Sequence, residues 1–145
     1  MTSANVSAAA GRAEWSNPSF QAFALLRLGF TVAPILFGLD KFVGVLADWP
    51  VYLWSGMASA LPGSPETIML VVGAIEIVAG ILVAVRPHIG GYVVAGWLAG
   101  IIVNLLLVGD YYDVALRDFG LLLGALTLAR LASAFPQTSL VGGRP

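Results

Sequence analysis

The residues best suited to chemistry are two opposite charges inside long apolar stretches. Arg27 lies in the apolar run 20–42, and Glu76 lies near the centre of the run 67–85. A charge at the centre of a membrane helix costs about 2.5–3.5 kcal/mol on insertion scales, so each must face protein or water. Counted along the two helices, both lie at similar depth, so we expect Arg27 to pair with Glu76. Such a pair either fixes how two helices meet or forms a charged site for a quinone headgroup, a small anion or a proton.

A second group of polar residues gathers near the outer ends of the apolar runs. It consists of Asp40 and Lys41, Asn104, and Arg117 with Asp118. Neighbouring residues on a helix point about 100° apart, so we do not expect sequence neighbours to pair. We expect Lys41 to pair with Asp118 on another helix, and Asp40 to pair with Arg117. The alternative is a set of end charges that reach the membrane surface and latch the helix ends.

Small residues predict where helices approach one another. Gly96 and Gly100 are four residues apart, and Gly120 and Gly124 repeat that spacing further along the chain. Small residues at this spacing allow the backbones of membrane helices to come close, so we expect all four at helix–helix contacts. Asn104 shares a face with Gly100, and we expect its amide to point inward and hydrogen-bond to another helix.

The composition limits the chemistry that this chain can carry. There is no cysteine, which excludes thiolate catalysis and cysteine-bound metal centres. The one histidine, His88, cannot supply both ligands of a bis-histidine haem, and we interpret it as a residue of a solvated turn. Asp110 and Asp113 have no supporting histidine, and hard cations need six or more oxygens, so no metal site is expected there. We expect no cofactor bound by protein ligands, while a quinone is compatible with the sequence.

The overall composition is typical of a membrane protein. Only 10% of the 145 residues are charged and 59% are hydrophobic, which leaves too little polar surface for a water-soluble domain. The net charge of −1 gives no basic field for nucleic acid. A bilayer core about 30 Å thick requires roughly 20 apolar residues per helix. We therefore predict an all-α integral membrane four-helix bundle with spans at about residues 20–42, 67–85, 89–109 and 114–135.

Residues typical of helix starts precede several of these runs. Asn17 stands before Pro18, and Ser64 stands before Pro65. A short polar side chain followed by proline suits the first turn of a helix, because proline lacks an N–H that would be unpaired there. We expect Asp113 to cap the last span in the same way.

The ends of the chain and its basic residues predict an orientation. Residues 1–19 form a polar N-terminal segment that we expect to be flexible, and residues 136–145 form a C-terminal tail. Basic residues flank the spans on the side of the two termini, which favours cytoplasmic N- and C-termini. These residues are Arg12, Arg86, Arg130 and Arg144.

The segment 43–62 joins the first two spans. Its apolar residues recur at helical spacing, and it holds two tryptophans and a tyrosine. Such a segment is typical of a short helix in the outer headgroup layer, where Trp and Tyr act as interface anchors. It is either a loop of an aromatic belt or a lid over an outward-facing pocket.

Three stretches resemble the DoxX family of small four-helix bacterial membrane proteins. The first run contains Leu26-Arg27-Leu28-Gly29 and Phe37-Gly38-Leu39-Asp40-Lys41-Phe42, similar to the family's Arg-Leu start and Gly-x-x-Lys-Phe ending. The second contains Glu76-Ile77-Val78-Ala79-Gly80, which resembles its Glu-x-x-x-Gly element. The last contains Leu116-Arg117-Asp118-Phe119-Gly120-Leu121-Leu122, which resembles its closing helix. The resemblance covers about residues 23–131.

The resemblance implies a multi-pass protein of the bacterial inner membrane. DoxX-like proteins have been linked to thiosulfate:quinone oxidoreductase and to membrane complexes that respond to oxidative and thiol stress. We therefore expect a membrane subunit or anchor of an oxidoreductase complex, with a protein partner and a possible quinone site. The alternatives are a small transporter or a proton or anion carrier that uses Arg27 and Glu76, and a structural assembly factor without activity of its own. A homo-oligomer is compatible with each.

Overall fold

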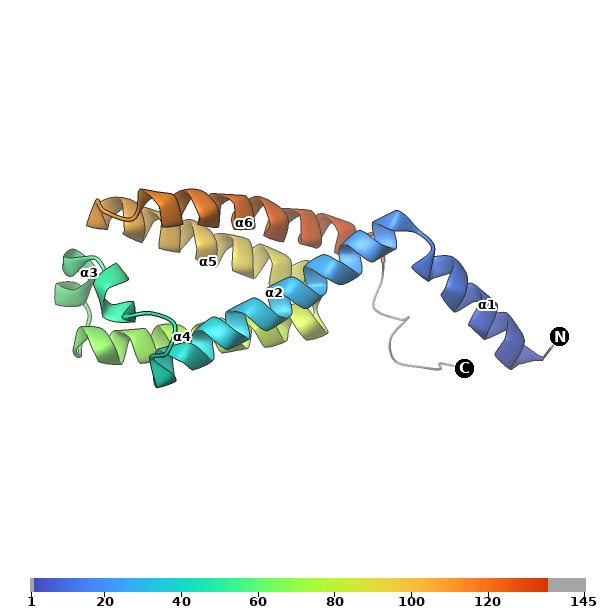
Figure 1. Ribbon diagram of the computed structural model, residues 1–145, viewed down its shortest axis with the longest axis horizontal. Helices are drawn as coiled ribbons and strands as arrows, with labels where there is room; N and C mark the ends of the chain where they lie inside the picture. Colours follow the sequence, from blue (N-terminus) through green and yellow to red (C-terminus); the bar gives the residue numbers. More distant parts are fainter. Residues whose placement is uncertain (1, 136–145) are drawn as a thin grey trace.

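The computed structural model describes residues 2–135, and this part of the chain contains helices and no strand (Figure 1). The predicted tail, residues 136–145, lies outside the described residues. Four helices are long, and the others are short or lie outside the packed body. The elements are α1 (Ser3–Trp15), α2 (Pro18–Val43), the 3-10 helix η1 (Trp49–Tyr52), α3 (Ser55–Ala60), α4 (Pro65–Val85), α5 (Pro87–Val108) and α6 (Tyr112–Ala132).

Three of the long helices, α2, α4 and α5, are long and apolar enough to cross a membrane. They correspond to the first three predicted spans. The fourth long helix, α6, has 21 residues, but its composition is more polar. Its charged residues are Asp113, Arg117, Asp118 and Arg130. The described part of the chain therefore has three helices suited to crossing a membrane, and the fourth membrane span stays a prediction.

Two of the predicted helix starts are confirmed. The Asn17 side chain accepts a hydrogen bond from the Ser19 N–H at 2.9 Å, and the Ser64 hydroxyl accepts one from the Thr67 N–H at 3.3 Å. The predicted Asp113 cap is wrong, because α6 begins before this residue. Asp113 instead lies in the first turn, where its charge complements the positive end of the helix dipole.

Most of the N-terminal segment, residues 1–19, forms the helix α1, and its flexibility stays a prediction. This helix contacts mainly α2, and Figure 1 shows it projecting away from the other helices. At its end the Trp15 ring packs edge-on against Phe20, with 5.0 Å between the ring centroids. Alanine has the highest intrinsic helix propensity, and the alanine-rich stretch of α1 accounts for a helix with no buried residue.

The long helices associate as two pairs, α2 with α4 and α5 with α6. Glycines bring the first pair into backbone contact. A Cβ added at Gly38 would lie 2.5 Å from the Gly73 carbonyl oxygen, and one added at Gly80 would lie 2.8 Å from the Thr31 carbonyl oxygen. Because neither position has room for a side chain, these contacts define the register of the antiparallel pair: Gly38 faces Gly73, and Thr31 faces Gly80.

Three of the four glycines expected at helix contacts have open space around them instead. A Cβ added at any of these would meet nothing within 4 Å: Gly96, Gly100 and Gly120. Gly124 does face a neighbour, since its Cβ would lie 3.1 Å from the Phe30 ring. In α5 the close contacts are made by Gly90, whose Cβ would lie 2.6 Å from the backbone of Val83 in α4, and by Gly91, whose Cβ would lie 2.9 Å from the Ala125 carbonyl oxygen in α6. The four-residue spacing places two glycines on one face but does not say whether that face points inward.

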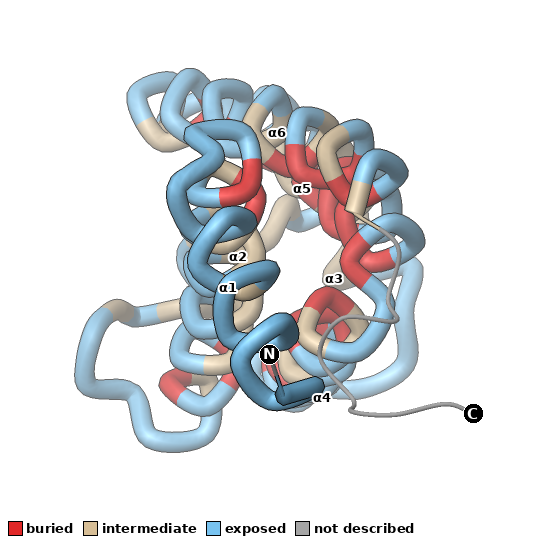
Figure 2. The backbone as a smooth tube through the Cα atoms, turned by 90° about the vertical axis from the view of Figure 1, so that its right-hand side faces the viewer, coloured by how far each residue is buried: buried red, intermediate tan, exposed pale blue. Residues whose placement is uncertain are grey.

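The hydrophobic core joins the two pairs at the end that holds the α4–α5 turn. Buried residues lie on the sides of the helices that face one another, while the outer sides are exposed (Figure 2). At this end the Phe23 ring stacks on Phe135, with 5.4 Å between centroids. The buried core residues are Phe20, Phe23, Ala79, Val83, Val94, Ala95, Leu98, Ala125, Leu128 and Ala132.

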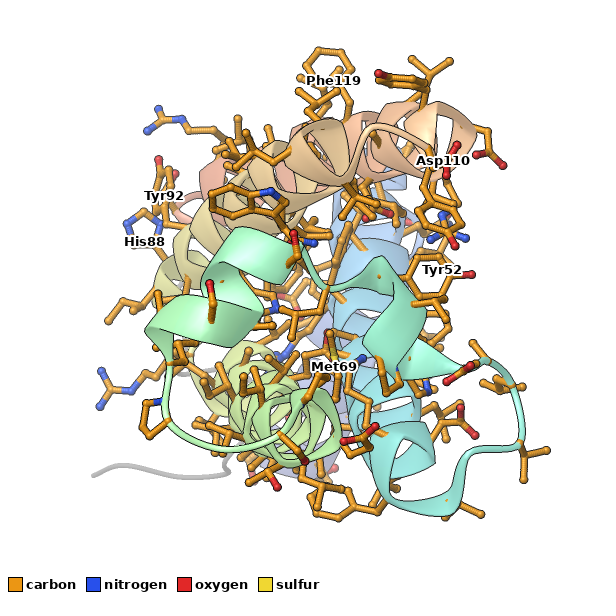
Figure 3. All side chains as sticks on the ribbon, turned by 90° about the vertical axis from the view of Figure 1, so that its left-hand side faces the viewer. Tyr52, Met69, His88, Tyr92, Asp110 and Phe119 are labelled. Atoms are coloured by element: carbon orange, nitrogen blue, oxygen red, sulfur yellow. The ribbon has the colours of Figure 1, made fainter. Side chains whose placement is uncertain are left out.

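At the opposite end the two pairs diverge, and the chain between α2 and α4 fills the opening (Figures 1 and 3). We call this chain, residues 44–64, the connector. Its η1 helix contacts both α4 and α5, and Met69 of α4 is buried nearby. The predicted single interfacial helix is thus two short helices, η1 and α3. They are separated by extended backbone at Leu53 and Trp54.

The glycine contacts between α2 and α4 give a first prediction. The substitution Gly38→Ala should destabilise the protein by about 1–3 kcal/mol, because the new methyl group forces two backbones apart. Thermal unfolding in detergent, followed by circular dichroism, measures the effect. Gly96→Ala makes the same chemical change in open space and serves as the control. Equal loss of stability in the two variants would contradict the proposed contact.

Candidate functional site

A buried ion pair joins α2 and α4 at the end of the molecule that holds the connector. The Lys41 ammonium donates to the Glu76 carboxylate at 2.7 Å. The two side chains are only 4% and 10% exposed, respectively. Both residues lie in helices that are long and apolar enough to cross a membrane. An ion pair in such surroundings is held away from water, so any proton or ligand that reaches it interacts with a nearly desolvated charge.

The register of α2 and α4 explains why these two residues meet. Lys41 lies beside Gly73, since a Cβ on Gly73 would be 3.0 Å from the Lys41 Cβ. Helical side chains lean toward the N-terminus of their own helix. In an antiparallel pair, Lys41 therefore leans along α4 toward Glu76, and Glu76 leans back toward Lys41. The long lysine stem covers the remaining distance.

The predicted pairing of Arg27 with Glu76 is wrong. The Arg27 guanidinium donates instead to the carbonyl oxygen of Ala84, near the end of α4, and lies 5.9 Å from the centroid of the Phe23 ring. Ala84 is about 12 Å further along α4 than Glu76, at 1.5 Å per residue. The prediction placed the start of α2 level with the end of α4. In the structure α2 extends beyond α4, and Arg27 leans away from Glu76 toward the α2 N-terminus.

Trp49 of η1 covers the ion pair from the connector side. The Lys41 ammonium lies 3.7 Å from the centroid of the Trp49 ring, close enough for a cation–π interaction. The indole N–H of the same ring donates to the Asp40 carboxylate at 2.8 Å. Trp49 thus contacts two charged neighbours of α2 at once, one through its face and one through its edge.

Asp40 binds the start of the connector, which replaces the predicted pairing with Arg117. Its carboxylate accepts hydrogen bonds from the backbone N–H groups of Val45 and Leu46 at 3.0–3.1 Å, besides the one from Trp49. These donors lie in the turn that follows α2, where Gly44 adopts a left-handed conformation with φ of 69°. The buried carboxylate is therefore fully engaged by the connector.

Arg117 and Asp118 pair with each other on α6, which contradicts the expectation that sequence neighbours do not meet. The Arg117 guanidinium donates to the Asp118 carboxylate through two nitrogens, each at 3.3 Å. The Arg117 side chain is 62% exposed and Asp118 only 7%. The two Cβ atoms do point in different directions, but the long arginine stem curls around the helix. The predicted pair of Lys41 with Asp118 is likewise wrong, because Lys41 is engaged by Glu76.

Asn104 of α5 binds the connector between η1 and α3. Its side chain points inward, as predicted, but its partners belong to the connector and not to another long helix. Its amide nitrogen donates to the Tyr52 carbonyl oxygen at 2.6 Å, and its oxygen accepts from the Trp54 N–H at 3.0 Å. These bonds satisfy the backbone on both sides of Leu53, where the chain is extended between η1 and α3. Asn104 therefore anchors the connector to the second helix pair.

The sequence did not identify Trp49 as part of the site. We interpreted Trp49 and Tyr52 as interface anchors, and nothing in their spacing links them to Asp40 or Lys41. Only the folded connector brings these rings together, with Trp49 and Tyr52 centroids 6.1 Å apart and Tyr52 and Tyr111 centroids 4.5 Å apart.

His88 lies at the other end of the molecule, in the first turn of α5 rather than in a loop. Its Nδ1 is 2.9 Å from the Ala129 carbonyl oxygen, and its ring packs edge-on against Tyr92 at 5.4 Å (Figure 3). In the part of the chain that the structure describes, no group of three or more His, Asp or Glu side chains is placed to hold a metal ion. The candidate site is therefore taken as the polar cluster at the connector end, which consists of Lys41, Glu76, Asp40 and Trp49.

Comparison of the chain with known protein families, with curated proteins and with solved structures finds no match.

The buried ion pair gives a second prediction. Lys41→Met should lower the free energy of unfolding by about 3–5 kcal/mol, because it leaves the Glu76 charge buried without a partner. The double variant Lys41→Met/Glu76→Met removes both charges and should recover most of this loss. Thermal unfolding of the single and double variants measures the coupling. A double variant as unstable as Lys41→Met would contradict direct pairing.

The connector anchors give a third prediction. Asn104→Leu should raise amide hydrogen exchange in residues 44–60 at least about fivefold, because two connector backbone groups lose partners that are worth about 1–3 kcal/mol each when buried. Exchange read by mass spectrometry in detergent or nanodiscs measures it. Ser59→Ala, which removes an exposed hydrogen bond within α3, is the control. Unchanged exchange in Asn104→Leu would show that the connector is held by other contacts.

Proposed function

We propose that the protein is an integral membrane subunit of a redox complex and that Lys41 and Glu76 form its functional centre. The observation that carries this proposal is the burial of a complete ion pair between α2 and α4. Replacement of such a pair by apolar side chains is often neutral or stabilising, so stability alone is a weak reason to keep it. Ionisable residues within membrane helices commonly mark ligand, ion or proton sites.

The proposed topology has four spanning helices with both termini on the cytoplasmic side of a bacterial inner membrane. The packing of α6 along α5 supports a fourth span, because the two helices form a closely packed antiparallel pair. Arg117 reaches solvent from one end of α6, and Arg130 lies in the last turn at the other end, so its charges lie near helix ends. The basic residues Arg12, Arg86 and Arg130 lie at the end of the molecule that carries the α4–α5 turn, which favours this end as cytoplasmic.

A quinone headgroup is the ligand that we propose for this site. The headgroup is a flat ring with two carbonyl acceptors, and when bound it would accept electrons and protons. Lys41 can donate a hydrogen bond to a carbonyl, the Trp49 ring offers a surface for stacking, and Glu76 can hold or release a proton. The chemistry of these three side chains therefore supports the proposal, with the quinone taking the place of Glu76 or Trp49 as a partner of Lys41. In the proposed complex, the electrons would come from the protein partner.

The resemblance to the DoxX family enters this proposal through residues that lie together in space. Its Gly-x-x-Lys-Phe ending contains Gly38 and Lys41, and its Glu-x-x-x-Gly element contains Glu76 and Gly80. Gly38 and Gly80 are two of the three close-contact glycines between α2 and α4, and the other two residues form the ion pair. The two separate motifs thus belong to one structural unit.

Purification from native membranes tests the proposal. The protein should co-purify with a redox partner and with quinone, both identified by mass spectrometry. The folded double variant Lys41→Met/Glu76→Met should lose the quinone at least about tenfold, whereas Arg117→Gln, which changes an exposed charge, should retain it.

Other outcomes separate the alternatives. Flux of protons or anions into liposomes that depends on Glu76, without quinone or partner, would replace this proposal with a carrier function. A double variant that keeps quinone, partner and assembly unchanged would show that the ion pair is not the functional centre. A partner that is lost from the double variant, with no quinone in either form, would favour an assembly factor.

A further inference from the structure

A shallow groove on the outer face of α4 and α5 is separate from the ion pair. It has a volume of about 300 Å³, and it is open to the surroundings. Its lining is entirely apolar: Val71, Ala74, Ile75, Val78, Ala79 and Leu82 of α4, with Val93 of α5. The residues of α4 that line it lie on the side of the helix that faces away from α2. Glu76 points to the other side, into the contact with α2.

The groove is about as long as half of the hydrocarbon core of a bilayer, and it continues from Leu82 past the middle of α4, the level of Glu76, to Val71. From Val71 to Leu82 it extends about 16 Å along the helix, at 1.5 Å per residue. Half of a hydrocarbon core is about 15 Å thick. Because both helices are suited to crossing a membrane, the groove would face lipid along this distance. A single extended hydrocarbon chain has the chemistry and the length to fill it.

A basic residue stands at the end of the groove. Arg86 follows Leu82 by one helical turn, and its backbone N–H donates to the Leu82 carbonyl oxygen at 2.7 Å. Arg86 is exposed and ends α4, so it lies where the apolar helix gives way to the polar layer. No carboxylate is among the residues that line the groove. An arginine at the level of the headgroups attracts anionic lipids and binds phosphate through several N–H groups.

We propose that the α4–α5 groove is a binding site for an anionic glycerophospholipid from the leaflet that contains the α4–α5 turn. One acyl chain lies in the groove between Val71 and Leu82, and the phosphate is bound by Arg86. This inference depends on the proposed membrane insertion of α4 and α5, but not on the quinone site. Charge complementarity at Arg86 selects an anionic lipid over a zwitterionic one, and the groove selects a chain over a free phosphate ion.

Native mass spectrometry of the purified protein in detergent tests the proposal, with phosphatidylglycerol and phosphatidylcholine of identical acyl chains as probes. We expect one phosphatidylglycerol to bind more tightly than phosphatidylcholine by about fivefold, the factor that corresponds to roughly 1 kcal/mol for one basic residue near an anionic headgroup. Arg86→Gln should abolish this preference. Arg130→Gln, in the last turn of α6, removes an arginine at the same end of the molecule and should preserve it.

A second pair of variants tests the groove itself. Ala74→Phe fills the groove and should reduce binding of both lipids, whereas Ala33→Phe makes the same change at an exposed position of α2 and should not. Equal affinity for the two lipids, or equal effects of Arg86→Gln and Arg130→Gln, would overturn the proposal. Crosslinking of a second copy of the chain to the groove, if it is lost in Ala74→Phe, would also overturn the proposal. Inorganic phosphate that competes as well as the lipid would assign the site to free anions instead.

Carbonate extraction of the expressed protein from membranes keeps this test distinct from that of the proposed function. A protein that resists extraction but shows no lipid preference contradicts the lipid site alone. A protein that is extracted contradicts membrane insertion, and both proposals fail with it.

Discussion

The backbone contact between α2 and α4 is the constraint on which the rest of the polar architecture depends. At Gly38, Gly73 and Gly80 the two helices approach so closely that a single methyl group has no room. Helices in such contact cannot slide without a clash, so their register is defined to the residue. This register brings Lys41 within reach of Glu76. It also brings Arg27 to the last turn of α4, where the Ala84 carbonyl has no partner within its own helix.

The ion pair in turn links the helices to the connector. Lys41 contacts both Glu76 and the ring of Trp49, while Asp40, its neighbour in sequence, binds the connector backbone and the indole N–H of Trp49. A change in the charge of Glu76 would therefore alter the surroundings of a connector residue as well as those of Lys41. The hydrophobic core cluster lies toward the other end of the molecule. At the connector end, these polar contacts and the hydrogen bonds of Asn104 join the diverging helix pairs together with buried apolar side chains such as Met69 and Leu105.

The helices of this fold could be predicted from the sequence more reliably than their relative positions. Long apolar runs predict long helices, and Asn17 and Ser64 mark two of the starts because capping depends on local chemistry. The pairing of Arg27 with Glu76 failed because it assumed that neighbouring spans begin and end at the same level. The prediction that Gly96 and Gly100 lie at helix contacts was wrong for a related reason. Their spacing shows that they share one face of the helix, but it does not show what lies opposite that face.

Within the candidate site, the sequence identified all three charged residues but none of their partners. Asp40, Lys41 and Glu76 stand out because charges are rare in apolar helices. Their contacts depend on the direction of each side chain along its helix, on the helix register and on the path of the connector. No local sequence pattern determines these three features. Trp49 shows the limit most clearly, because its role exists only once the connector has folded over α2.

The two anchors of the connector bind main-chain atoms. Asp40 accepts from the N–H groups of Val45 and Leu46, and Asn104 binds the carbonyl of Tyr52 and the N–H of Trp54. Main-chain groups are the same for nearly every amino acid, so evolution can change the side chains of these four residues without losing either anchor. In diverging relatives, Asp40 and Asn104 should therefore persist while much of the connector drifts. The distance between the anchors along the chain should be maintained more strictly than the residues that fill it.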